Sequence, residues 1–284
     1  MKSLSLDSLR EKIEEYASIP SDQTLPRDAK KLVDALLTAL ERGEVRAAVE
    51  RGGTWEAVPW VKRGILLGFR AGELEGTSVG DGVLTFVDKD TYPTRQFTAD
   101  DGVRVVPGGS SIRRGVFIAR GVVCMPPMYV NVGAYVDAGT MVDSHALVGS
   151  CAQIGTRVHL SAAAQIGGVL EPVNASPVVI EDDVLVGGNC GVYEGTVVRK
   201  RAVLAAGVVL TRGTPVFDLV KETVYRGNAD TPLEIPEGAV VVPGARAIKT
   251  GWGSSEHLSL QAPIIVKYRD EKTDLATALE GWLR

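Results

Sequence analysis

An apolar side chain recurs at every sixth residue through the middle of this chain. The next position is often small or polar, and the fourth position after it is mostly small or β-branched. This period fits neither an amphipathic helix, which repeats about every 3.6 residues, nor the alternation of a lone strand; hexapeptide repeats are typical of a parallel β-helix. The repeating residues are Val106, Ile112, Ile118, Cys124, Val130, Val136, Val142, Val148, Ile154, Leu160 and Ile166, then Ile180, Val186, Val192, Val198, Leu204 and Leu210.

Each six-residue unit is expected to form a short strand and a turn, and three units close one triangular coil. The repeating residue then points inward and stacks on its counterpart one coil away, while small residues let the chain turn at the corners. Because such repeats bury their faces only against neighbouring repeats, several coils are needed, and residues 103–215 supply them. A valine-rich segment of an α/β sheet would not keep this spacing through two runs.

The repeat is interrupted once, between Ile166 and Ile180. The gap of fourteen residues is two longer than two units need, and it contains two prolines. We expect residues 171–178 to form a loop pushed out at one corner of a coil. Loops on a rigid scaffold often carry binding groups, although a harmless insertion would give the same spacing.

The segments on either side of the repeat have mixed patterns. Residues 1–102 predict a small α/β domain packed on the start of the coil, with Ser5 or Asp7 as N-cap of its first helix. Its predicted elements are helices over 2–17, 27–42 and 60–69 and a hairpin formed by 45–49 and 52–56. Residues 216–284 predict strands within 216–248, a turn at 251–255, a strand at 263–268 and a helix at 274–283 that caps the solenoid.

Composition narrows the partners and the compartment. With a net charge of −4 in 284 residues, the chain offers no electrostatic case for binding nucleic acid or an anionic membrane. It has no apolar run of spanning length and no apolar core of a signal peptide at its start, so we expect a cytoplasmic protein. The cysteines, Cys124, Cys151 and Cys190, have no close pairing, fit a reducing compartment and are expected to fill space in the core.

The residues between the repeating positions closely resemble the tetrahydrodipicolinate N-succinyltransferase family of hexapeptide-repeat acyltransferases. The resemblance covers most of the chain from about residue 35. Its central motifs are 130–137 (VNVGAYVD), 139–143 (GTMVD), 148–155 (VGSCAQIG) and 167–172 (GGVLEP), with further similarity at 60–70, 104–107, 117–120, 180–182, 192–195 and 264–267.

The resemblance implies a left-handed β-helix, a hand that the general preference for right-handed crossovers would not have predicted. It also implies transfer of a succinyl group from succinyl-CoA to the amino group of ring-opened tetrahydrodipicolinate, in diaminopimelate and lysine biosynthesis. The partners would be this dicarboxylate and the acyl-CoA, the assembly a homotrimer, and no cofactor or metal would be bound permanently.

Two residues match the family's substrate site. Asp143 matches the catalytic and substrate-binding aspartate. The substrate ammonium group must lose a proton before it can attack a thioester, so a base is needed within hydrogen-bond reach. Because Asp143 follows the inward Val142, it should stand outside the coil, where a neighbouring subunit can complete a cleft. Arg104 matches the substrate-binding arginine, and a guanidinium binds carboxylates in bidentate fashion.

The acyl-CoA needs close approach to the backbone and a charge for its phosphates. Small residues one coil apart, Gly187 and Gly188 with Ala205 and Ala206, would let the pantetheine chain lie against the coil. Lys200 is the predicted phosphate contact, with Arg201 and Arg212 as further candidates.

One position departs from the family pattern. Members of the family carry a second glutamate three residues before a Glu-Gly pair, and Gly191 stands at that position here. A mechanism with two carboxylates is therefore in question. Asp143 acts alone, or Glu194 or a bound water takes part of the role.

Three other functions remain alternatives. N-acetyl transfer to the same substrate from acetyl-CoA is the nearest, since the residues that read the donor are not evident from the sequence. A β-helix serving only as a scaffold would explain the repeat but not Arg104 and Asp143. A zinc site like that of γ-type carbonic anhydrases is disfavoured, because His145 and His159 are not one coil apart and His257 lies beyond the repeat.

Overall fold

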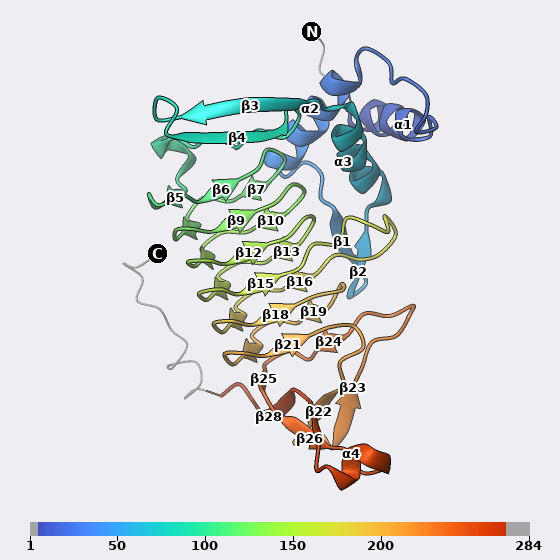
Figure 1. Cartoon of the computed structure of the whole chain (residues 1–284), viewed down its shortest axis with the longest axis vertical. Helices are drawn as coiled ribbons and strands as arrows, with labels where there is room; N and C mark the ends of the chain where they lie inside the picture. Colours follow the sequence, from blue (N-terminus) through green and yellow to red (C-terminus); the bar gives the residue numbers. More distant parts are fainter. Residues whose placement is uncertain (1–4, 271–284) are drawn as a thin grey trace.

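The computed structural model describes residues 5–270 and has the form of a three-sided prism (Figure 1). Short parallel strands stack along the prism, the N-terminal helices cover one end, and the C-terminal strands lie at the other end. The hexapeptide repeat thus folds as the parallel β-helix that its period predicts.

Three sheets form the sides of the prism, and the chain visits sheets 1, 2 and 3 in turn. Sheet 1 contains β5 (Arg104–Val105), β8 (Val123–Cys124), β11 (Met141–Val142), β14 (His159–Leu160), β17 (Leu185–Val186) and β20 (Val203–Leu204). Sheet 2 contains β6 (Ser111–Ile112), β9 (Tyr129–Val130), β12 (Leu147–Val148), β15 (Gln165–Ile166), β18 (Gly191–Val192) and β21 (Val209–Leu210). Sheet 3 contains β7 (Phe117–Ile118), β10 (Tyr135–Val136), β13 (Gln153–Ile154), β16 (Val179–Ile180), β19 (Val197–Val198) and β24 (Glu234–Ile235).

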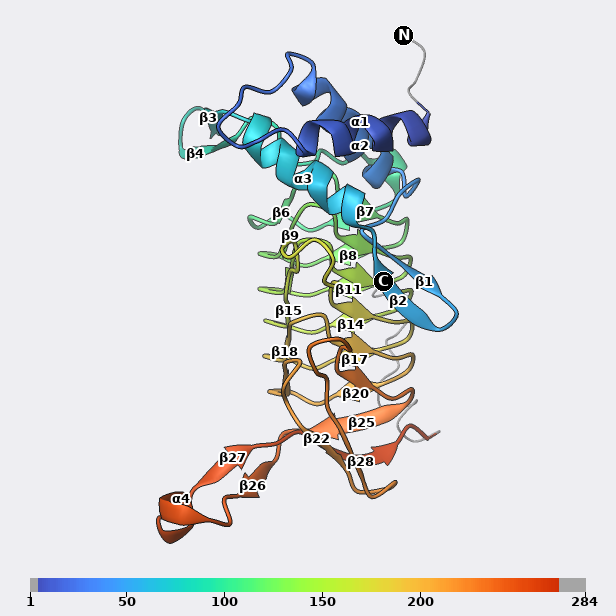
Figure 2. The same ribbon diagram turned by 90° about the vertical axis from the view of Figure 1, so that its right-hand side faces the viewer.

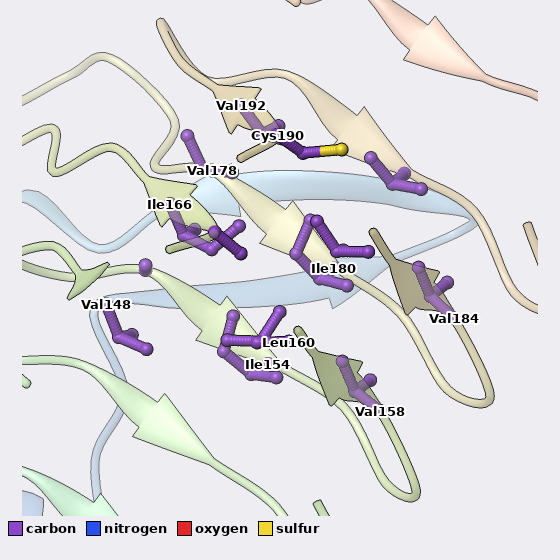
Figure 3. Close-up of a cluster of buried hydrophobic side chains, with 14 of the residues drawn as sticks. Val148, Ile154, Val158, Leu160, Ile166, Val178, Ile180, Val184, Cys190 and Val192 are labelled. Atoms are coloured by element: carbon purple, nitrogen blue, oxygen red, sulfur yellow. The ribbon is translucent and has the colours of Figure 1, made fainter. Parts of the chain in front are cut away.

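From Ile112 onward, the second residue of each short strand points inward and forms the core (Figure 3). Val142 pairs with Leu160, and Leu160 with Val186, so each inward side chain stacks on the one in the next coil. All three are fully buried, and burial of each such side chain contributes about 1.5–3 kcal/mol.

The first repeating residue, Val106, is an exception to the predicted stacking. Cys124 pairs with Val105 and not with Val106, and Val105 is exposed. The regular core therefore begins at Ile112, because the chain enters the prism one residue out of step.

The corners use a left-handed residue at a fixed place, the third after the inward side chain. His145 (φ 62°), Ala163 (φ 58°) and Asn189 (φ 57°) follow Val142, Leu160 and Val186 in this way. The residue directly after the inward position is small for another reason. A Cβ at Gly187 would lie 2.6 Å from the backbone nitrogen of Ala206, because the coils stack closely there.

The interruption of the repeat forms the predicted loop at the corner between sheets 2 and 3, where it joins β15 to β16. Lys62, which is fully buried, donates a hydrogen bond from Nζ to the carbonyl oxygen of Ala175 in this loop at 2.5 Å. The N-terminal region therefore holds the loop in place.

The N-terminal region contains the predicted helices and hairpin with slightly shifted ends, and Ser5 caps the first helix. A second hairpin and a 3-10 turn follow in a part where the sequence predicted no elements. The elements are α1 (Leu6–Ala17), α2 (Ala29–Glu41), β1 (Ala48–Arg51), β2 (Thr54–Ala57), α3 (Pro59–Ala71), β3 (Leu74–Val79), β4 (Leu84–Lys89) and η1 (Ala99–Asp101).

The hairpin β1–β2 lies beside the coils (Figure 2), and side chains in and next to it contact residues of sheet 3 and its edge. Trp55 donates from Nε1 to Glu181 Oε1 at 2.9 Å, and Arg46 donates from Nε to Gln153 Oε1 at 2.9 Å. The Arg46 guanidinium also lies 3.7 Å from the centroid of the Tyr135 ring. A segment of the same chain therefore covers one of the three sides of the prism.

The C-terminal region continues sheet 1 and adds a projecting arm. Its elements are β22 (Val216–Asp218), β23 (Thr223–Tyr225), β25 (Ala239–Val242), β26 (Ala245–Ala247), α4 (Gly251–Ser255), β27 (Ser259–Gln261) and β28 (Ile264–Tyr268). The predicted strand at 263–268 is confirmed, whereas the predicted turn at 251–255 is a short helix. The helix predicted at 274–283 lies outside the described residues, and the domain boundaries 1–102, 103–215 and 216–284 remain predictions.

Candidate active site

Asp143 lies on the outside of the prism, at the corner where sheet 1 passes into sheet 2. It follows β11 directly, because the inward Val142 ends that strand. Its Oδ1 accepts a hydrogen bond from the backbone N–H of Ser144 at 2.7 Å, and 29% of the side chain is exposed. The carboxylate is thus oriented by its own turn and open to a ligand on one side.

His159 is the nearest ionisable partner of this carboxylate. It lies in β14, beside β11, and its Nε2 is 3.8 Å from Asp143 Oδ2. The sequence pattern drew attention to His159 only as a possible zinc ligand, and its contact with Asp143 was not predicted. The spacing of the repeat could have indicated this contact. His159 lies one coil after Met141, with which it pairs, and Met141 is two positions before Asp143.

The small residues predicted for the acyl-CoA lie along the same corner as Asp143. The backbone N–H groups of Asp143, Ser161 and Gly187 donate hydrogen bonds to the carbonyl oxygens of Leu160, Val186 and Leu204 in the next coil. Asp143, Ser161 and Gly187 therefore occupy the same corner in successive coils. Ala206 in the next coil is exposed and Gly188 is half-buried. Gly187, Gly188, Ala205 and Ala206 therefore form one edge below Asp143, which we call the small-residue edge.

Arg104 lies on the same sheet as Asp143, two strands away. It pairs with Val123 in β8, which in turn pairs with Met141 in β11. Neighbouring strands are about 4.8 Å apart, so the two backbones are separated by roughly 10 Å. The long, exposed arginine side chain can therefore bind the far end of a ligand held at Asp143.

Lys200 and Arg201 do not join the small-residue edge within one chain. Both follow β19 at the corner between sheets 3 and 1, across the width of sheet 1 from Gly187. Lys200 lines a small cavity of about 100 Å³ together with Arg46 and Trp55 of the N-terminal region. The predicted contact with the phosphates is thus separated from the predicted contact with pantetheine.

Glu194 lies on the opposite edge of sheet 2 from Asp143, at the corner that holds the loop. Its Oε2 accepts a hydrogen bond from the backbone N–H of Arg212 at 3.1 Å. It lines a cavity of about 720 Å³ between the loop and the coils. The lining residues are Gly167, Gly168, Val169, Glu171, Pro172, Ala175, Tyr193, Glu194, Thr211 and Arg212.

The cysteines are core residues. Cys124, Cys151 and Cys190 are free and buried, as the sequence predicted. Burial raises the pKa of the Cys151 thiol to about 12 and lowers the pKa of the Lys62 ammonium. In the described part of the chain, no group of three or more His, Cys, Asp or Glu is arranged to hold a metal ion.

Comparison with known proteins gives matches over almost the whole chain. Residues 8–71 match the family model for the N-terminal part of tetrahydrodipicolinate N-succinyltransferase, and residues 177–212 match the model for the hexapeptide repeat of succinyl-transferase. The 2,3,4,5-tetrahydropyridine-2,6-dicarboxylate N-succinyltransferase of Bradyrhizobium diazoefficiens is 44% identical over 264 residues, 90% of each chain. The protein of the same name from Polynucleobacter asymbioticus is 42% identical over 287 residues, 99% of each chain.

This chain belongs to the tetrahydrodipicolinate N-succinyltransferase family. A solved structure from Campylobacter jejuni, described as a 2,3,4,5-tetrahydropyridine-2-carboxylate N-succinyltransferase, has a TM-score of 0.55 at 17% identity and covers 87% of this chain and 64% of that chain. At this low identity, the similarity to the Campylobacter jejuni structure bears on the fold alone. The family and the left-handed β-helix expected from the motifs are confirmed. Among residues 5–270 no helix is long and apolar enough to cross a membrane.

Proposed function

We propose that this chain transfers a succinyl group from succinyl-CoA to the amino group of ring-opened tetrahydrodipicolinate, in diaminopimelate and lysine biosynthesis. The observation that carries the proposal is the single corner on which Asp143 and the small-residue edge are aligned. Amide formation from a thioester requires two parts. One is a carboxylate able to accept a proton, and the other is an open backbone edge along which a pantetheine chain can lie. Relatives that span the chain are named for N-succinyl transfer to the same dicarboxylate, which supports this reaction.

In this mechanism Asp143 takes a proton from the substrate ammonium. The free amine then attacks the thioester carbonyl carbon and the new C–N bond forms. The nitrogen loses its second proton to solvent, and the C–S bond breaks as the tetrahedral intermediate collapses. CoA leaves as the thiol after the proton is returned to its sulfur. General acid–base catalysis by one positioned group of this kind contributes typically about 10²–10⁴-fold to the rate.

Two neighbours prepare Asp143 for this role. The N–H of Ser144 fixes one carboxylate oxygen, so the other oxygen is directed toward His159 and the substrate. The His159 ring packs beside that second oxygen, with its Nε2 at 3.8 Å. Arg104 holds a substrate carboxylate at the other end, which positions the amine for attack.

We infer a homotrimer in which each site is shared between two subunits. Sheet 3 is covered by the chain's own hairpin, whereas sheets 1 and 2 present half-buried apolar residues outward, among them Met141, Leu185 and Leu147. Asp143 and the cavity with Glu194 lie on opposite edges of sheet 2. Closed three-fold packing would bring the edge of one subunit to the cavity of the next.

The test is release of free CoA thiol with tetrahydrodipicolinate, with succinyl-CoA and acetyl-CoA compared side by side. We expect strong preference for succinyl-CoA in the wild type. Preference for acetyl-CoA would make the protein an N-acetyltransferase, and no turnover with either donor would favour a scaffold.

Asp143→Asn is the matched variant in the same assay, because it keeps the size of the side chain and removes the base. We expect its turnover number to fall by about 10²–10⁴-fold. Asp137→Asn, which alters a carboxylate at a different corner, is the control. Unchanged turnover in Asp143→Asn would place the base elsewhere, and Glu194→Gln would then be measured.

A further inference from the structure

Tyr193 lies folded back over a bare stretch of sheet 2. Gly191 occupies the outward position of β18, since Val192 is the inward residue. The Cβ that any other residue would carry at 191 lies 2.5 Å from Cε2 and 2.9 Å from Oη of Tyr193. A Cβ at Gly167, at the end of the neighbouring strand β15, would lie 2.8 Å from Cδ1 of the same ring. The phenol therefore occupies the space above two glycines.

The ring also borders the large cavity. Tyr193 lines it together with Glu194 and Arg212, opposite loop residues such as Glu171 and Pro172. At about 720 Å³ the cavity has the size of a site for a small molecule. The Tyr193 ring is half-buried, and its hydroxyl lies beside Gly191.

This position is where the chain departs from the family pattern. The resemblance places a glutamate at 191, and a glutamate side chain would rise from the point that the Tyr193 ring now occupies. The polar group at this place has thus changed from a carboxylate to a phenol. A phenol can donate a hydrogen bond as well as accept one, whereas an ionised carboxylate can only accept.

We propose that Tyr193 is a catalytic residue of the acyl-transfer site, where its hydroxyl donates a hydrogen bond to the thioester carbonyl oxygen. The inference rests on the proposed function. As the amine forms its bond to the carbonyl carbon, the electron pair of the C=O bond moves to oxygen, and the phenol stabilises that negative charge. When the C–S bond breaks, the pair returns to re-form the carbonyl, and Tyr193 keeps its proton throughout.

The roles of the two catalytic residues differ from those in a site with two carboxylates. Asp143 remains the group that accepts the ammonium proton, and Tyr193 acts only on the developing oxyanion. Donors aimed at an oxyanion act mainly on the turnover number, because the interaction is stronger in the transition state than with bound substrate.

The test is steady-state kinetics of Tyr193→Phe with succinyl-CoA. Phenylalanine keeps the ring over Gly191 and Gly167, so the fold is retained. We expect the turnover number to fall by about 10²–10³-fold with the KM values changed by less than about tenfold. Tyr16→Phe, which removes a remote hydroxyl bonded to Asp28, is the control and should match the wild type.

A second pair of variants checks the equivalence of the two positions. Tyr193→Val removes the ring, and Tyr193→Val with Gly191→Glu puts the family's glutamate into the space left. We expect the double variant to exceed Tyr193→Val in turnover.

Wild-type turnover in Tyr193→Phe would overturn the role of the hydroxyl, and a double variant no better than Tyr193→Val would overturn the equivalence. Absence of wild-type activity with succinyl-CoA would instead contradict the proposed function itself, so the two failures are distinguishable.

Discussion

At the scale of single residues, each coil depends on one inward aliphatic side chain per strand. Leu160 is fully buried between Val142 and Val186, with which its strand pairs on either side. Because protein interiors are close-packed, removing such a side chain leaves a cavity that the rigid coils above and below cannot fill by moving inward.

Leu160→Ala should therefore lower the free energy of unfolding by about 2–5 kcal/mol. Leu219→Ala is the matched control, since Leu219 is 64% exposed and its truncation should change stability by less than about 0.5 kcal/mol. Urea unfolding of both variants measures the difference. Equal effects would mean that Leu160 does not carry the packing energy assigned to the core.

The buried thiols predict how stability changes in alkali. Burial raises the pKa of Cys124 and Cys151 from 9.0 to about 12. The folded state thus keeps protons that the unfolded chain loses above about pH 9, so the stability that these groups contribute is present below pH 9 and is lost as the pH rises toward 12. We expect each thiol to lower the free energy of unfolding by about 1.4 kcal/mol per pH unit in this window.

Cys124→Ala isolates the contribution of one thiol, because it leaves the other buried cysteines in place. Its free energy of unfolding should fall less steeply than that of the wild type between about pH 9 and about pH 11. Chemical unfolding at several pH values gives both slopes. Parallel slopes would show that the Cys124 thiol ionises equally in the folded and unfolded states.

At the scale of elements, the loop and the hairpin β1–β2 show how the N-terminal region completes the prism. Sequence spacing predicted both elements, and the packing of one against the other was not predictable from it. Lys62 on α3 reaches the loop through a single carbonyl oxygen, that of Ala175. Since Ala175 lines the large cavity, the position of a buried lysine affects the wall of a candidate binding site.

Lys62→Met should loosen the loop without unfolding α3, because methionine keeps an apolar stem of similar length and loses only the donor. Hydrogen exchange at residues 168–178 is expected to become faster, while the global stability changes little or rises, since a buried cation is removed. Lys31→Met, at an exposed position of α2, is the control. Unchanged exchange in the loop would show that Lys62 does not hold it.

At the scale of the whole molecule, the candidate site is spread over edges that one chain does not bring together. Asp143 and Tyr193 lie at opposite edges of sheet 2, whereas the proposed mechanism needs the amine at Asp143 to attack the thioester carbonyl at Tyr193. Assembly of subunits is the physical route that joins such edges, because a rigid β-helix cannot bend to close the gap.

Mixing Asp143→Asn subunits with Tyr193→Phe subunits tests this sharing. Random trimers would contain intact sites formed by Asp143 of one subunit and Tyr193 of its neighbour, so activity should rise to about a quarter of the wild-type value. Each variant assembled alone provides the baseline. A mixture no more active than its components would mean that one subunit supplies both residues.

The coil and its corners could be predicted from the period of six, because three such units close one coil with their inward side chains stacked. The motifs between the repeating positions indicated the family. The sequence by itself also determined that Asp143 lies outside the coil, since Val142 must be inside. The tertiary structure decided the rest. The contact of His159 with Asp143, the fold of the Tyr193 ring over Gly191 and the cover that the hairpin places on sheet 3 depend on side-chain direction and on packing between distant segments, neither of which a repeat period contains.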